Sequence, residues 1–293
     1  MLPVACRNRP AHMACHTTQA SPDERRRESI MKIVIRSTAG QAMSLTARIM
    51  EHALRRDPAM TLGLATGRTM DGVYADLVQA HRQRGLDFSR CQTFNLDEYV
   101  GVPPSSGRSY RAYMDTHLFS QVNIARSATH VPDGMAPDLA AHCGEYEHSL
   151  HASGGVDLQL LGLGRNGHIG FNEPFSAFTS RTRVVTLDPA TRDQNRDMFG
   201  GDPDHVPYHA ITMGVGTILD AHRIVVLVTG TAKAAALADM IEGPLTASTS
   251  ATALQMHANC LVIADETAAA ALSRRPFIDH MMRHDAELKA LVS

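Results

Sequence analysis

The sequence of 293 residues has no tryptophan, few cysteines and no long hydrophobic run. Its five cysteines are scattered, without a CxxC pair or the Cys/His spacing of a zinc site, which argues against a disulfide framework and a structural metal. No apolar run approaches the roughly 18 residues that span a bilayer. A formal net charge of only -2 creates no strong field for nucleic acid or an acidic membrane surface. These absences favour a cytoplasmic protein that acts on a small molecule.

Residues 1–30 differ in character from the rest of the chain. The segment is polar, lacks a hydrophobic period and precedes "MKIVIR", which is typical of a first strand. We expect residues 1–30 to be a disordered N-terminal extension and residues 31–293 to form a single domain. A transit peptide is one alternative, but Pro3 and Pro10 oppose the amphipathic helix that such a peptide needs. A translation start at Met31 is another.

Short apolar runs alternate with helical patterns through the rest of the sequence. Strands are predicted at 32–35, 61–66, 90–96, 156–164, 223–230 and 260–265. Helices are predicted at 42–56, 70–83, 138–152 and 232–242. This alternation predicts an α/β fold with a mostly parallel sheet that helices cover on both faces. Because ligands of such sheets bind beyond the carboxyl ends of the strands, the residues that follow each strand are the candidate site.

Two of the expected strands end in turns rich in hydroxyl groups and glycine. The first turn consists of Thr66, Gly67, Arg68 and Thr69, and the second of Thr229, Gly230 and Thr231 followed by Lys233. Free backbone N–H groups and the positive end of a helix dipole suit such turns to a phosphate monoester, and a lysine adds a point charge. Ordinary capped turns and a solvated lysine are the structural alternative.

A third strand end carries the adjacent carboxylates Asp97 and Glu98. Side chains of neighbouring strand residues point to opposite faces, so we expect one carboxylate to enter the cleft and the other to face away. A carboxylate partly withdrawn from water is a competent proton acceptor. Helix capping or a salt bridge is the structural alternative for this pair.

The fourth strand end is the stretch "LGLGRNGHIGFNEP" at residues 161–174. Its glycines allow the backbone to turn sharply and to approach a ligand closely. His168 is the group of this stretch that titrates near neutral pH, and Glu173 follows close enough to orient the imidazole through a hydrogen bond. Together, the four strand ends predict phosphate binding and proton transfer without a metal.

Several motifs, in the same order, resemble the glucosamine-6-phosphate deaminase family over residues 31–285. They are "LGLATGRT", "FNLDEYVG", "GLGRNGHIGFNEP", "SRTRVVTL", "AITMGVGTILDA" and "GTAKAAAL" before "IEGP". The resemblance implies a modified Rossmann-like fold and the conversion of D-glucosamine 6-phosphate and water to D-fructose 6-phosphate and ammonia. It implies a sugar phosphate as the partner and no cofactor.

The resemblance also assigns catalytic roles. Asp97 matches the base that moves a proton between C2 and C1 of the opened sugar. His168 matches the residue that opens the ring by moving a proton to the ring oxygen, and Glu173 matches its supporting carboxylate. Asn166 stands where many members have an aspartate. Because an amide carries no charge, Glu173 is expected to bear more of the imidazolium stabilisation.

The phosphate-binding positions of the family are only partly kept. The positions that resemble the family's phosphate-binding residues are Thr66, Gly67, Thr69 and Lys233. Arg68 replaces a small residue of the turn, and Asp197 stands where many members place a phosphate-binding arginine. Arg196 is one position away, and one residue turns a helical side chain by about 100 degrees. The sequence leaves open whether Arg196 or Arg68 compensates.

Some members of the family are hexamers that N-acetylglucosamine 6-phosphate activates at a subunit interface. Ser176 and Arg183 keep part of that pattern, but Val185 replaces the expected lysine and removes a cationic phosphate contact. We therefore expect this activation to be weak or absent. The sequence leaves open whether the chain forms a homo-oligomer.

Three alternative functions share much of this pattern. A galactosamine-6-phosphate deaminase differs in the stereochemistry at C4, which no motif reveals. A 6-phosphogluconolactonase shares the sheet and the histidine loop but hydrolyses an ester, so it needs no base at C2, and "FNLDEYVG" argues against it. A catalytically silent sensor of sugar phosphates would keep the phosphate turns but relax the acid/base set, whereas Asp97, His168 and Glu173 are all present.

Overall fold

The computed structural model describes residues 31–292 of the chain. The expectation of a disordered extension at residues 1–30 lies outside these residues. None of the helices between residues 31 and 292 combines the length and the apolar character that a membrane crossing requires. In the same part of the chain, no three His, Cys, Asp or Glu side chains gather in an arrangement suited to a metal ion.

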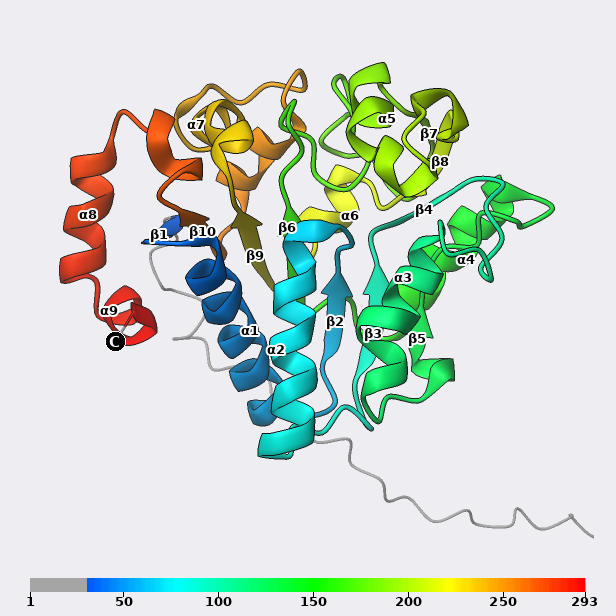
Figure 1. Cartoon of the computed structure of the whole chain (residues 1–293), viewed down its shortest axis with the longest axis horizontal. Helices are drawn as coiled ribbons and strands as arrows, with labels where there is room; N and C mark the ends of the chain where they lie inside the picture. Colours follow the sequence, from blue (N-terminus) through cyan, green and yellow to red (C-terminus); the bar gives the residue numbers. More distant parts are fainter. Residues whose placement is uncertain (1–30, 293) are drawn as a thin grey trace, which may run out of the picture.

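Seven parallel strands form the centre of the molecule (Figure 1). From one edge to the other they are β1 (Lys32–Arg36), β10 (Cys260–Asp265), β9 (Arg223–Val228), β6 (Leu158–Gly162), β2 (Thr61–Leu64), β3 (Gln92–Asn95) and β5 (Thr129–His130). The inner strands are buried along nearly their whole length, because helices cover both faces of a parallel sheet. The predicted mostly parallel sheet is confirmed.

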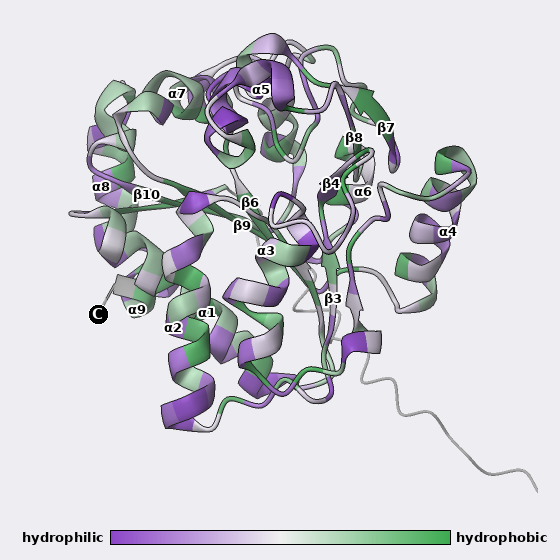
Figure 2. Cartoon of the chain, turned by 45° about the vertical axis from the view of Figure 1, so that its right-hand side comes forward, coloured by the Kyte–Doolittle hydropathy of each residue, from purple (hydrophilic) through white to green (hydrophobic). Residues whose placement is uncertain are grey.

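Helices pack on both faces of this sheet. They are α1 (Ala39–Arg56), α2 (Arg68–Arg84), α3 (Tyr110–His117), α4 (Leu139–Ala152), α5 (Pro189–Asn195), α6 (Val215–Leu219), α7 (Ala234–Glu242), α8 (Arg275–His284) and α9 (Ala286–Val292). Figure 2 shows the sheet between α1 and α2 on one side and α4 on the other. The fold is therefore the single-domain α/β architecture that the alternating pattern predicts.

The starts of the helices differ in how their free N–H groups are satisfied. The Thr38 side chain accepts a hydrogen bond from the N–H of Gln41 at α1, and the Asp138 side chain accepts one from Ala141 at α4. At α2 the preceding residue is Gly67, with φ of 109 degrees, and no side chain caps the helix. The start of α2 therefore keeps free donors and a positive dipole end for a ligand.

A second, three-stranded sheet is antiparallel, and the sequence patterns did not reveal it. Its order is β4 (Asp97–Tyr99), β8 (His209–Thr212) and β7 (Arg183–Thr186). The prediction that Asp97 and Glu98 end a strand of the main sheet is therefore wrong. β3 ends at Asn95, and the two carboxylates begin β4. Strands of three or four residues are too short for a hydrophobic period to stand out.

Two hydrophobic cores accompany the two sheets. The larger fills the space between the seven strands and their helices. The smaller lies beside the three-stranded sheet and is rich in aromatic residues, with Tyr99 packed against Tyr110, Phe171 and Phe199 at ring-centroid distances of 5.0, 5.3 and 5.1 Å. Tyr99 belongs to β4, so this aromatic cluster anchors the strand that begins with Asp97.

Candidate active site

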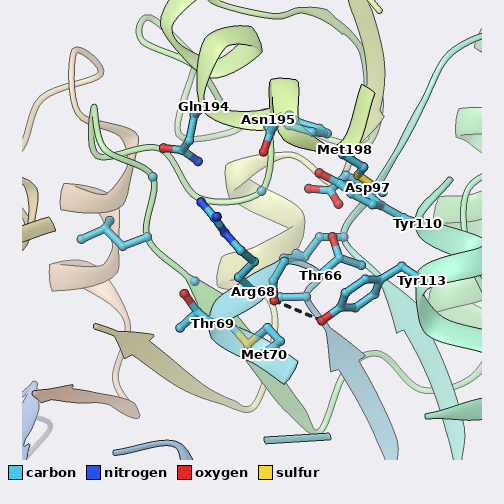
Figure 3. A pocket seen from close by; sticks show the side chains of 18 of the residues that line it. Thr66, Arg68, Thr69, Met70, Asp97, Tyr110, Tyr113, Gln194, Asn195 and Met198 are labelled. Carbon is cyan, nitrogen blue, oxygen red and sulfur yellow. Dashed lines mark hydrogen bonds between the residues drawn. The ribbon is translucent and has the colours of Figure 1, made fainter. Parts of the chain in front are cut away.

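A cavity of about 750 Å³ lies where the two sheets meet (Figure 3). The segments that follow β2, β6 and β9 line it, together with the start of β4 and residues of α3 and α5. This is the carboxyl edge of the main sheet, where parallel α/β folds bind ligands. The predicted site residues that line the cavity are Thr66, Gly67, Arg68, Thr69, Asp97, His168 and Lys233.

The turn after β2 forms one wall of the cavity and leads directly into α2. Gly67 adopts a positive φ of 109 degrees, a conformation that residues other than glycine rarely adopt. The Tyr113 hydroxyl donates to the Gly67 carbonyl at 3.0 Å, the contact drawn in Figure 3. The uncapped start of α2 and the hydroxyls of Thr66 and Thr69 face the same cavity. This geometry suits an anion with several acceptor oxygens.

Lys233 provides a cation from the turn after β9. Its Nζ lies 3.4 Å from Oε1 of Gln194. No carboxylate of residues 31–292 lies within ion-pair distance of it. Burial, with a smaller contribution from the like charge of Arg165, lowers the pKa of Lys233 to about 8. An ammonium group that is desolvated and has no acidic partner is stabilised by an incoming anion.

Asp97 projects into the cavity without a partner. Its carboxylate forms no hydrogen bond or ion pair with any of the residues from 31 to 292, although the residue is only 6% exposed. Burial, followed by the neighbouring charge of Glu98, raises the pKa of Asp97 to about 8. A carboxyl group with this pKa accepts a proton more strongly than an exposed aspartate, and it can return the proton near neutral pH.

Glu98 points away from the cavity, as the alternation of strand side chains predicts. Its carboxylate accepts backbone hydrogen bonds from Tyr99, Tyr110 and Arg111, each at 2.9 Å. Tyr110 and Arg111 begin α3, so Glu98 satisfies the free N–H groups of that helix. Burial raises the pKa of Glu98 to about 6, although the three donors act in the opposite direction. The two adjacent carboxylates therefore divide into one that faces the cavity and one that caps a helix.

His168 is oriented by a hydrogen-bonded group of side chains behind it. Its Nδ1 lies 3.4 Å from Oε2 of Glu173 and 3.4 Å from the hydroxyl of Thr191. Asn166 donates its side-chain N–H to the same Glu173 oxygen at 3.1 Å, and its Oδ1 accepts the backbone N–H of His168 at 3.2 Å. Because these contacts occupy Nδ1, Nε2 remains for a ligand in the cavity.

The hydrogen bonds that orient His168 also keep Glu173 ionised. Burial acts to raise the pKa of Glu173, but hydrogen bonds from His168, Thr191 and Asn166 outweigh it and hold the pKa below its ordinary value. The carboxylate therefore stays ionised beside the imidazole, which favours the imidazolium that forms during proton transfer. Asn166 holds Glu173 in place without adding charge.

Two glycines of the histidine loop are required by close packing. A Cβ at Gly164 would lie 2.4 Å from Nε2 of His168. A Cβ at Gly170, whose φ is 56 degrees, would lie 2.9 Å from the Thr212 hydroxyl and 3.5 Å from Oδ2 of Asp97. The glycines thus allow the loop to pass directly beside both the imidazole and the carboxylate. Close packing therefore explains two of the glycines that surround this histidine.

The arginines near position 197 do not lie together. Arg196 does not line the cavity and instead pairs with Asp193 at 2.8 Å. Arg68 does line it, and Figure 3 shows its side chain extending from the start of α2 toward α5. Its Nη1 lies 3.6 Å from Oδ2 of Asp197, and both side chains are largely exposed. Arg196 therefore does not replace the phosphate-binding arginine that many family members have at position 197.

Several cavity residues were not assigned roles from the sequence. Tyr110 and Tyr113 line the cavity from α3, and Gln194 and Asn195 line it from α5 (Figure 3). The spacing of the two tyrosines, three residues apart in "SYRAYM", places them on one helix face and could have indicated them. The α5 residues had no comparable signal, because polar residues in a short helix usually face solvent.

Comparison with known proteins places the chain in a family. The model of the family described as "Glucosamine-6-phosphate isomerases/6-phosphogluconolactonase" matches residues 36–263. The chain belongs to this family. Glucosamine-6-phosphate deaminase of Arthrobacter sp. (strain FB24) is 46% identical over 250 residues, which are 85% of this chain and 96% of that protein. The same enzyme of Shewanella woodyi is 44% identical over 260 residues, 89% of this chain and 98% of that protein.

Solved structures within the family agree. A structure described as a monomeric glucosamine-6-phosphate deaminase is 41% identical and superimposes with a TM-score of 0.81, over 82% of this chain and all of that one. A 6-phosphogluconolactonase from Trypanosoma brucei reaches a TM-score of 0.64 over 84% of this chain and all of that one, at 18% identity. The lactonase shares the fold alone, so the choice between the two reactions depends on the residues of the site.

Proposed function

We propose that this protein is a glucosamine-6-phosphate deaminase, which converts D-glucosamine 6-phosphate and water to D-fructose 6-phosphate and ammonia. The observation that carries the proposal is the unpartnered carboxylate of Asp97, which shares one cavity with His168 and the phosphate turns. The family relatives that are 44–46% identical carry the name of this enzyme. No cofactor enters the proposed reaction.

The phosphate group is assigned to the turn-rich end of the cavity. The uncapped start of α2, the hydroxyls of Thr66 and Thr69, and Lys233 supply hydrogen-bond donors and positive charge. The phosphate group takes no part in the reaction. Its binding at this end holds the sugar so that C1 and C2 face Asp97.

The reaction begins when the sugar ring opens. His168 takes the proton of the C1 hydroxyl and delivers it to the ring oxygen, so that the C1–O5 bond breaks and the aldehyde forms, while Glu173 stabilises the transient imidazolium. Asp97 then removes the proton from C2, which gives an enol-amine, and returns it to C1, which gives the iminium of the ketose. Water adds at C2, and ammonia leaves. One carboxylate on one face of two adjacent carbons suffices for both transfers, and each such step contributes on the order of 10²- to 10⁴-fold.

The galactosamine 6-phosphate isomer is the second candidate substrate, because the cavity geometry does not define the contact to O4. A 6-phosphogluconolactonase is less favoured, since ester hydrolysis uses no base at C2 and gives no role to the buried, unpartnered carboxylate of Asp97. The proposal extends to a cytoplasmic location. Whether the chain acts as a monomer or a homo-oligomer is a separate question that sedimentation of the full chain addresses.

The deciding assay measures ammonia and fructose 6-phosphate after the full-length protein is mixed with glucosamine 6-phosphate. Parallel reactions contain galactosamine 6-phosphate and 6-phosphogluconolactone. We expect equimolar ammonia and ketose from the gluco substrate, and the Asp97→Asn variant provides the background. Faster turnover of the galacto substrate would reassign the specificity. Lactone hydrolysis without ammonia release from either amino sugar would overturn the proposal.

A further inference from the structure

The phosphate end of the cavity lacks a cation that the family resemblance led us to expect. Position 197 is an aspartate, and Arg196 is outside the cavity in an ion pair with Asp193. Arg68 faces the cavity, but its nearest charged neighbour is the carboxylate of Asp197 at 3.6 Å, which offsets its charge. Any positive charge in addition to that of Lys233 must come from another part of the cavity wall.

Arg165 lies in the loop between the two phosphate turns. The loop follows β6, and β6 is placed between β9 and β2 in the sheet. The turn at 229–233 follows β9, and the turn at 66–69 follows β2. Because the ends of neighbouring parallel strands lie side by side, the loop after β6 separates the two turns. Arg165 lines the same cavity as both.

The glycines of this loop restrict where a cationic side chain can stand. A Cβ at Gly164 would lie 2.4 Å from the His168 ring, and one at Gly167 would lie 2.4 Å from Cγ2 of Thr249. Neither position accepts a side chain without displacing a neighbour. Asn166 is occupied with Glu173. Position 165 is therefore the one between Gly164 and Gly167 that can direct a long side chain toward a ligand.

The Arg165 guanidinium has no protein partner of its own. Among residues 31–292, no carboxylate lies within ion-pair distance of it, and it forms no hydrogen bond with another side chain or carbonyl group. Its charge is close enough to Lys233 to contribute to the lowered pKa of that ammonium group. Two neighbouring cations without acidic partners repel each other in the free protein, and an anion between them removes that repulsion.

We propose that Arg165 is a ligand of the substrate phosphate and supplies, from the histidine loop, the positive charge that Asp197 does not. The proposal rests on the proposed function for the identity of the sugar, but the ligand it requires is the phosphate monoester dianion. Arg165 is thereby a residue that determines substrate affinity, while Asp97 and His168 carry out the proton transfers. The same loop then holds the phosphate at one residue and opens the sugar ring at another.

The test compares Arg165→Gln with Arg165→Lys, Arg68→Gln and a control, Arg126→Gln. Arg126 is an exposed arginine that pairs with Asp115 away from the cavity. Inorganic phosphate serves as the probe, measured by calorimetry and as a competitive inhibitor. We expect Arg165→Gln to weaken phosphate binding and to raise the KM for glucosamine 6-phosphate about tenfold, because a charged hydrogen bond is lost. The kcat is expected to change little, and Arg165→Lys to recover part of the affinity.

A second measurement separates a direct contact from a disturbance of the loop. Phosphate binding to the wild-type protein should weaken as the pH rises through the pKa of Lys233, near 8. In Arg165→Gln this midpoint should move to higher pH, because the like charge beside Lys233 is gone. A loop that is merely distorted would lower kcat through His168 and would leave the midpoint unchanged.

Each outcome has a defined meaning. Unchanged phosphate affinity in a folded Arg165→Gln variant would overturn the proposal, and a loss confined to Arg68→Gln would assign the contact to Arg68. If phosphate binding depends on Arg165 but no ammonia is released from glucosamine 6-phosphate, the proposed function fails while the phosphate site stands. If ammonia is released with an unchanged KM in Arg165→Gln, the proposed function stands and this inference fails.

Discussion

The two sheets contribute different chemistry to the same cavity. The seven-stranded sheet is parallel and deeply buried, and loops at its carboxyl edge supply the phosphate turns and His168. The three-stranded sheet is small and antiparallel, is backed by an aromatic cluster, and begins with Asp97. Binding groups therefore come from the larger sheet, whereas the base for the proton shift comes from the junction with the smaller one.

The junction between the sheets is held from both sides. The backbone N–H of Leu96 donates to the carbonyl of Leu64 in β2 at 3.0 Å, and the carbonyl of Leu96 accepts from Met213, just after β8, at 2.7 Å. Leu96 is thus hydrogen-bonded to both sheets, and Asp97 follows it directly. A base fixed in this way is preorganised relative to a sugar whose phosphate is bound to the other sheet.

The largest expected effect follows from removal of this base. Asp97→Asn keeps the size of the side chain but cannot accept the C2 proton, so kcat should fall on the order of 10²- to 10⁴-fold. The affinity for inorganic phosphate should stay near that of the wild type, because the phosphate turns belong to the other sheet. Ammonia release and calorimetry measure the two quantities. An equal loss of both would show that Asp97 is structural.

The stability of Asp97→Asn provides a control for this prediction. Burial raises the folded-state pKa of Asp97 to about 8, whereas an unfolded aspartate has its ordinary value of 3.8. The folded wild type therefore binds the proton more tightly than the unfolded chain, and its stability declines as the pH rises from the lower value toward the higher. Asparagine removes this dependence. The Tm of the variant should exceed that of the wild type more at pH 8 than at pH 4.

The pH dependence of kcat/KM should separate the contributions of the two sheets. Asp97 acts as a base only when deprotonated, so kcat/KM should rise with pH toward about 8. Lys233 holds a phosphate dianion best when protonated, so kcat/KM should fall as the pH rises beyond about 8. The Lys233→Arg variant tests this assignment, because a guanidinium stays charged throughout. Its descending limb should disappear below pH of about 10, and a limb that persists would point to another group.

The sequence revealed six of the seven strands of the main sheet, but not the two-residue edge strand β5 or the smaller sheet. Near-continuous apolar runs such as "RIVVLV" identify buried parallel strands without reference to the rest of the fold. The strand at 183–186 alternates between partly buried and exposed residues over only four positions, which no pattern distinguishes from a loop. The pairing that makes it a strand is formed with residues about 25 positions later, at 209–212.

The site residues show the same division. The placement of His168, Glu173 and the two turns followed from their positions after strands, and the opposite orientations of Asp97 and Glu98 followed from strand geometry. The place of Arg196 outside the cavity could not be predicted in this way. The reason is that α5 ends at Asn195 and residues 196–199 continue as a 3-10 helix with a different rotation per residue. Arg165 was overlooked because an exposed arginine in a loop is ordinary until its neighbours across the sheet are known.

A smaller effect is expected when the core behind the three-stranded sheet is loosened. Phe199 is almost fully buried and packs against Tyr99 next to Met198, which lines the cavity. Phe199→Leu should cost about 1 kcal/mol of stability and raise the KM, because the cavity wall at Gln194, Asn195 and Met198 shifts. Phe88→Leu in the larger core is the matched control. It should cost similar stability and leave the KM unchanged, as measured by denaturant unfolding and steady-state kinetics.

The smallest response is expected for allosteric activation, since Val185 of β7 offers no charge for a second phosphate. Arg183, two residues earlier, is held within the chain, where its Nη1 donates to Asn172 and its Nη2 to Ser176, both at 2.9 Å. An effector would have to displace these contacts and would still lack the lysine. We expect a hyperbolic substrate curve with a Hill coefficient of about 1, unchanged by N-acetylglucosamine 6-phosphate. A sigmoidal curve that the acetylated sugar phosphate makes hyperbolic would contradict this, and Val185→Lys tests whether the missing cation is the reason.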